Sequence, residues 1–133
     1  MSEIVVLDAV SVATLARAAR DRAAAESDQA IVGALVRYAD ELDDITESAV
    51  TLDQHEHEIE HQLRWWDDRV RALQSDLTGH PGDDVEIVRA LALYRGRISG
   101  AHTMRRHYAQ QRNALLARQT TADTACADAI AAP

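Results

Sequence analysis

The sequence predicts an all-α fold, a long antiparallel helical hairpin with an additional N-terminal helix. The 133 residues include 25 Ala but only 5 Gly and 2 Pro, a composition that favours helices and leaves few turn residues for an all-β fold. Apolar residues recur at alternating steps of four and three from residue 31 to residue 77. One short stretch near residue 80 concentrates turn-forming residues, so the chain is expected to fold back there as a single domain spanning 1–133.

The first helix is expected over about residues 8–26. Asp8 or Ser11 can accept hydrogen bonds from the free amides of its first turn. Ser27 and Asp28 mark the break that follows.

The second helix is expected over about residues 28–77. Thirteen of the fourteen positions in its stripe are apolar, and Glu56 is the exception. A spacing that averages 3.5 residues keeps one stripe on one side of a continuous helix and requires a partner helix along it. Such a helix would be roughly 70 Å long, which predicts a rod rather than a globule. The stripe consists of Ile31, Leu35, Tyr38, Leu42, Ile45, Ala49, Leu52, Glu56, Ile59, Leu63, Trp66, Val70, Leu73 and Leu77.

Residues 78–83 are expected to form the turn, with Asp83 or Asp84 capping a third helix over about residues 84–118. The same cadence continues in this helix, although Gly96 and Gly100 weaken it. The tail over 119–133 has little to bury and is expected to be weakly ordered. The third stripe consists of Ile87, Leu91, Tyr94, Ile98, Ala101, Arg105, Tyr108, Arg112 and Leu115.

Charge favours pairing of the second and third helices. Nine carboxylates and no Arg lie between Tyr38 and Leu63, whereas seven Arg and no carboxylate lie between Ile87 and Ala122. Folding about the turn places Glu56 opposite Arg105. This pair is predicted to set the register, as a lone polar core position does in coiled coils. The alternative is that both side chains extend to solvent along a thin core.

Two long helices leave their apolar flanks partly uncovered, so the sequence predicts a homodimer or heterodimer. Adjacent tryptophans point about 100° apart on a helix. Trp66 therefore belongs to the stripe, and Trp65 lies at its margin, as a contact to the third helix or as a hot spot for another chain. The predicted interface residues are Trp65, Trp66, Leu63, Ile59, Val36 and Val50.

A histidine-rich segment offers an alternative, a metal site. Glu58 and His61 make the Glu-x-x-His step of di-iron bundles, and His57 with His61 makes an i, i+4 pair, with His102 expected close by across the hairpin. If Ile59 faces the partner helix, however, these side chains point outward.

Composition argues against several other functions. The formal net charge of −8 disfavours a nucleic-acid partner, and an Ala-rich core is poorly suited to an enzyme pocket. No cofactor is predicted, and Cys126, the single cysteine, lacks a placed base. We expect no signal peptide and no membrane-inserted segment.

Several segments together resemble the helical-hairpin (Trp-x-Gly-like) domains of actinobacterial type VII secretion substrates and of toxin N-terminal domains. These are Leu-x-Arg-Tyr-Ala-Asp-x-Leu at 35–42, the long acidic helix with tryptophan near its end, the Gly-Asp-Asp after the turn, and the Arg-rich third helix. The resemblance implies a cytoplasmic protein that is then secreted without a cleaved signal peptide. It also implies contacts with secretion machinery or an effector.

Three functions follow as hypotheses. The first is a non-enzymatic protein–protein interaction module that resembles a type VII secretion hairpin and acts on itself or on a second small helical protein. The second is a structural or adaptor coiled coil unrelated to secretion. The third is a metal-binding, ferritin-like bundle.

Overall fold

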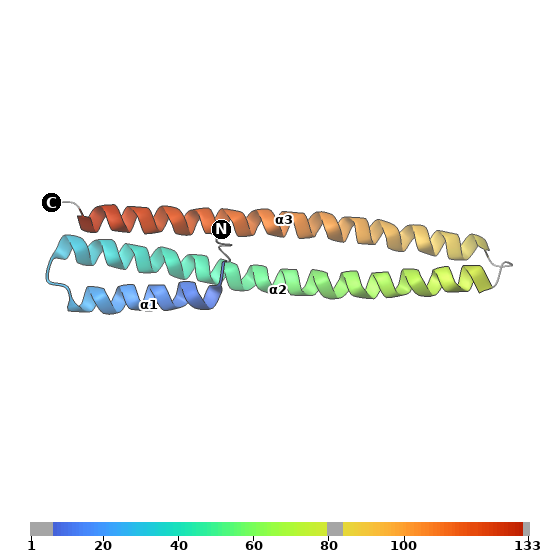
Figure 1. Ribbon diagram of the computed structural model, residues 1–133, viewed down its shortest axis with the longest axis horizontal. Helices are drawn as coiled ribbons and strands as arrows, with labels where there is room; N and C mark the ends of the chain where they lie inside the picture. Colours follow the sequence, from blue (N-terminus) through green and yellow to red (C-terminus); the bar gives the residue numbers. More distant parts are fainter. Residues whose placement is uncertain (1–6, 80–83, 132–133) are drawn as a thin grey trace, which may run out of the picture. The chain divides into compact units, whose positions relative to one another are not determined.

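The computed structural model describes residues 7–79 and 84–131 and consists there of three helices without any strand (Figure 1). They are α1 (Ala9–Ala25), α2 (Gln29–Gly79) and α3 (Asp84–Ala131). The predicted all-α class is confirmed. Of the predicted turn over 78–83, residues 78 and 79 belong to α2, and the rest lies outside the described residues.

The chain packs as two compact units, where the sequence predicted one domain. Unit 1 comprises Met1–Asp53 and Gln110–Pro133, and unit 2 comprises Gln54–Ala109. Both α2 and α3 contribute to each unit, whereas α1 belongs to unit 1 alone.

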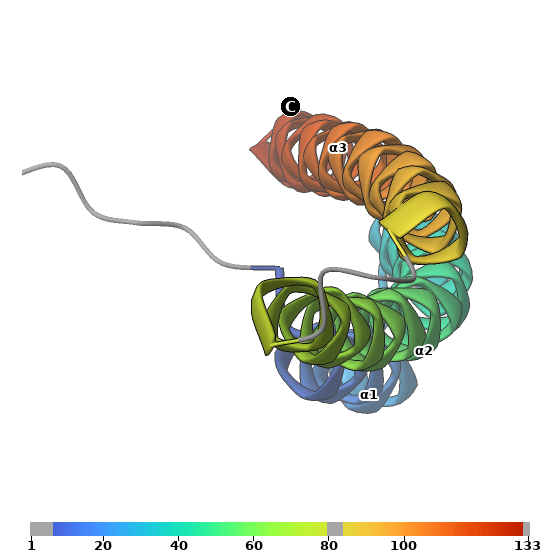
Figure 2. The ribbon, with the colours of Figure 1, turned by 90° about the vertical axis from the view of Figure 1, so that its right-hand side faces the viewer.

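Helix α1 begins as expected and packs through small residues. Asp8 is its N-cap, since Val10 N donates to Asp8 Oδ1 at 3.0 Å and Ser11 Oγ donates to Asp8 Oδ2 at 2.9 Å. Its buried residues recur at steps of four and three, which defines one face: Val12, Ala16, Ala19 and Ala23. In unit 1, α2 lies between α1 and α3 (Figure 2).

Helix α2 is stabilised at its start by Asp28, whose side chain accepts from Ala30 N at 3.0 Å and whose carbonyl accepts from Val32 N at 2.9 Å. All fourteen stripe positions are buried or half-buried. Leu42 and Ile45 are fully buried. The stripe predicted from spacing is therefore the inner face of α2 in both units.

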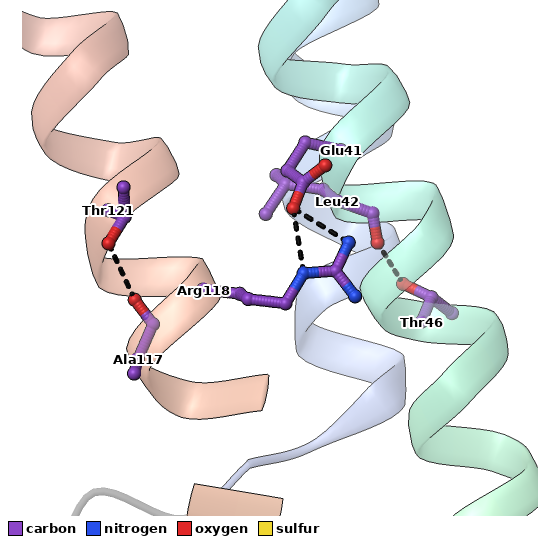
Figure 3. A network of polar contacts seen from close by, with 6 residues as sticks. All are labelled: Glu41, Leu42, Thr46, Ala117, Arg118 and Thr121. Carbon is purple, nitrogen blue, oxygen red and sulfur yellow. Dashed lines mark hydrogen bonds and ion pairs between the residues drawn. The ribbon is translucent and has the colours of Figure 1, made fainter. Parts of the chain in front are cut away.

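Cross-helix contacts set an antiparallel register in unit 1. In unit 1, Arg118 on α3 donates from Nε and Nη2 to Glu41 Oε1 at 3.0 and 2.8 Å (Figure 3). Further along α2, Asp53 accepts from Arg112, which precedes Arg118 on α3. The residue numbers of the α3 partners thus decrease as those of the α2 partners increase, which defines antiparallel helices.

The predicted end of the third helix near residue 118 is wrong, because α3 continues to Ala131. The reason lies in the residues after 118. Gln119, Ala122 and Cys126 keep the four-and-three cadence and are half-buried in unit 1. Small side chains in register are enough to keep α3 packed there.

Candidate protein-interaction surface

Burial is very uneven between the two units. Among the described residues, unit 2 contributes three buried hydrophobic side chains, namely Leu63, Leu91 and Ala101, and the others belong to unit 1. Unit 2 also holds large apolar side chains that remain exposed: Trp65, Val85, Val88, Leu93 and Met104. Unit 2 therefore offers apolar surface without much core of its own.

An aromatic cluster crosses from α2 to α3 in unit 2. The Trp65 and Trp66 ring centroids are 4.6 Å apart in an edge-to-face arrangement. Tyr94 of α3 lies 5.2 Å from the Trp66 ring and 6.4 Å from the Trp65 ring, the latter also edge-to-face. Trp65 therefore contacts the third helix, one of its two predicted roles, while 44% of its surface stays exposed.

Two arginines lie against these rings. The Arg69 guanidinium carbon is 4.7 Å from the Trp65 ring centroid, and that of Arg97 is 5.1 Å from the Trp66 centroid. No ion pair joins Arg69 or Arg97 to a carboxylate within residues 7–79 and 84–131. We call the five residues Trp65, Trp66, Arg69, Tyr94 and Arg97 the tryptophan patch. Trp, Tyr and Arg are the residue types that dominate binding energy at protein interfaces.

The other predicted interface residues fall into two groups. In unit 2, Leu63 is 5% exposed and Ile59 is half-buried, so both belong to the inner face of α2. In unit 1, Val36 and Val50 keep 41% and 44% of their surface exposed. Only Trp65, Val36 and Val50 in this set therefore present substantial apolar surface outward.

The predicted register pair needs correction. Arg105 Nε donates to Glu60 Oε1 at 2.9 Å, so the partner of Arg105 is Glu60 rather than Glu56, one helical turn away. The Arg105 side chain is 53% exposed. A register estimated from the centre of the turn is accurate only to about one turn of helix, which explains the difference.

The candidate metal ligands do not converge. His57, Glu58, His61 and His102 are all exposed. Within the part of the chain that the structure describes, no group of three or more His, Cys, Asp or Glu side chains could hold a metal ion. The outward direction inferred for the α2 residues agrees with their exposure.

A second polar cluster, which the sequence did not suggest, lies in unit 1. Tyr38 donates its hydroxyl hydrogen bond to Asp123 Oδ1 beside a groove of about 310 Å³ that Cys126 also lines. Burial, followed by Asp123, raises the pKa of the Tyr38 hydroxyl well above its usual value. Burial, followed by Asp123, also raises the pKa of the Cys126 thiol. A thiol with a raised pKa is a poor nucleophile at neutral pH. The only sequence signal for this cluster was that residues 122 and 126 keep the four-and-three spacing of the α3 stripe.

Fold and surface define the class as an all-α protein of two long antiparallel helices with a third helix on one unit. None of the helices in the described residues is long and apolar enough to span a membrane. Comparison with protein-family models, with curated proteins and with solved structures finds no match for this chain.

Proposed function

We propose that the chain is a non-enzymatic protein–protein interaction module whose partner is a second copy or another small helical protein. The observation that carries this proposal is the tryptophan patch. Trp65 keeps 44% of its surface exposed in a unit that buries three hydrophobic residues among those described. Burying this surface against a partner would stabilise the complex by roughly 25 cal/mol for each Å² of apolar area removed from water.

The resemblance stated from the sequence supplies a cellular setting for this proposal. A hairpin of this kind would be made in the cytoplasm and exported without a cleaved signal peptide. The hairpin would act as a partner or chaperone of a secreted effector. What supports this setting is the cadence and composition quoted above, together with the hairpin fold.

Sedimentation velocity of the purified chain at micromolar concentration tests the proposal, together with affinity capture from the native host analysed by mass spectrometry. We expect either a dimer or a stoichiometric complex with one helical protein, and Trp65→Ala is expected to weaken it. Val10→Ala is the matched control, because Val10 is 73% exposed and lies in unit 1. A compact monomer that captures no partner would contradict the proposal.

A further inference from the structure

Several arginines of α3 in unit 2 make no ion pair with a described carboxylate. Among the seven arginines between Ile87 and Ala122, three pair with carboxylates of α2. The other four have no carboxylate partner within the described residues: Arg89, Arg95, Arg97 and Arg106. All four lie in unit 2, so their guanidinium groups are available to carboxylates of a partner.

The face beside Arg97 is also open and apolar. Leu93 and Met104 are 55% and 41% exposed. Gly96 and Gly100 lie between them at helical spacing, and a Cβ atom at either position would meet nothing within 4 Å. Internal packing therefore does not require glycine there, although each glycine costs the helix about 1 kcal/mol relative to alanine. Glycines at this spacing allow close approach of another helix.

The chain itself carries a surface of opposite charge. On α2 in unit 1, Asp44 and Glu47 are exposed and make no ion pair within the described residues. Val36 and Val50, both more than two-fifths exposed, lie on the same helix, before Asp44 and after Glu47 respectively. We call Val36, Asp44, Glu47 and Val50 the acidic face.

We propose that the tryptophan patch docks the acidic face of α2 in a second copy of this chain. Arg69 and Arg97 would face Asp44 and Glu47, and Trp65 would cover Val50, three residues after Glu47 on α2. A guanidinium held over a ring by a cation–π contact keeps N–H donors available for carboxylates. The proposal rests on the proposed function and specifies its partner.

Charge reversal tests this pairing in the full chain. Arg97→Glu and Glu47→Arg are each expected to raise the dissociation constant of the dimer at least about tenfold, because like charges would meet at the contact. An equimolar mixture of the two variants is expected to recover wild-type affinity, because each reversed contact then again joins opposite charges. Sedimentation velocity measures association, and circular dichroism checks that each variant keeps its helix content and melting temperature.

Arg106→Glu is the matched control. Arg106 lies nine residues after Arg97, which at 100° per residue is the opposite side of α3. The Arg106→Glu variant makes the same change of charge in the same unit and is expected to leave the dissociation constant near that of the wild type.

Gly100→Ala is expected to raise the melting temperature of the chain, because alanine favours the helix. It is also expected to weaken the dimer, because the added Cβ atom would hinder close approach of the second copy.

Three results would overturn the inference. One is a dimer that is indifferent to Arg97→Glu, another is a mixture that does not regain affinity, and the third is a wild-type chain that stays monomeric. A monomer that still captures another helical protein from its host would leave the proposed function standing. A monomer that captures nothing would contradict both.

Discussion

At the scale of single residues, Arg112 differs from Arg105 and Arg118 because it binds a backbone carbonyl as well as a carboxylate. Its Nη1 donates to the Leu7 carbonyl at 3.1 Å, and its Nη2 donates to Asp53. The side chain is 22% exposed, whereas that of Arg118, which pairs with Glu41, is 43% exposed. Burial decides how much each contributes, because water screens exposed pairs strongly.

We therefore expect Arg112→Ala to lower the free energy of unfolding by about 1–3 kcal/mol, since a charge-assisted bond to a partly buried carbonyl is lost. Arg118→Ala is expected to cost below about 1 kcal/mol. Urea titrations followed by circular dichroism would measure both. Equal losses in the two variants would show that burial does not separate them.

The Tyr38 hydroxyl predicts a pH dependence. Its folded-state pKa lies above the unfolded value of about 10. Above that pH the unfolded chain releases the proton while the folded chain keeps it, so the stabilisation from Tyr38 is complete below pH 10 and is lost as pH rises. The difference in unfolding free energy between wild type and Tyr38→Phe should shrink between pH 9 and pH 11. A difference independent of pH would contradict the assigned cause.

At the scale of elements, the inner face of α2 was predictable and several details were not. A four-and-three cadence of apolar residues suffices to place Leu42, Ile45 and Leu63 inside, because helical geometry alone converts spacing into a face. The end of α3 was missed because small residues give weak hydrophobic signals even when they pack. The Tyr38–Asp123 hydrogen bond could not be predicted from a local sequence pattern, because it joins residues far apart in sequence.

The packing of α1 on α2 depends on small side chains, which predicts intolerance of larger ones. Ala39 on α2 is fully buried, and Ala16 on α1 is 1% exposed. We expect Ala39→Leu to lower the free energy of unfolding by about 1–3 kcal/mol through overpacking. Ala24→Leu, at an exposed position of α1, is the control and should change it by less than about 0.5 kcal/mol. Thermal or urea unfolding would rank the two, and a neutral Ala39→Leu would show that the interface has room.

At the scale of the whole molecule, the two units differ in how much apolar surface they bury. Unit 1 contains most of the buried hydrophobic residues that the structure describes, and unit 2 contains Leu63, Leu91 and Ala101. Local stability follows buried apolar contact. Continuity of α2 and α3 through both units therefore does not imply uniform stability along them.

Hydrogen–deuterium exchange measured by mass spectrometry should show this difference directly. Backbone amides of α2 after residue 54 and of α3 before residue 109 are expected to exchange faster than those of the same helices in unit 1. Raising the protein concentration until the chain self-associates should slow exchange in unit 2. Uniform protection along α2 at low concentration would contradict the prediction.

The distribution of two rare residue types gives the molecule a built-in pair of optical reporters. Both tryptophans belong to unit 2, and the lone thiol, Cys126, belongs to unit 1. Indole emission therefore reports on one unit, while an acceptor dye attached through sulfur would report on the other. Resonance energy transfer between them would follow the separation of the units during unfolding or complex formation without any engineered amino acid.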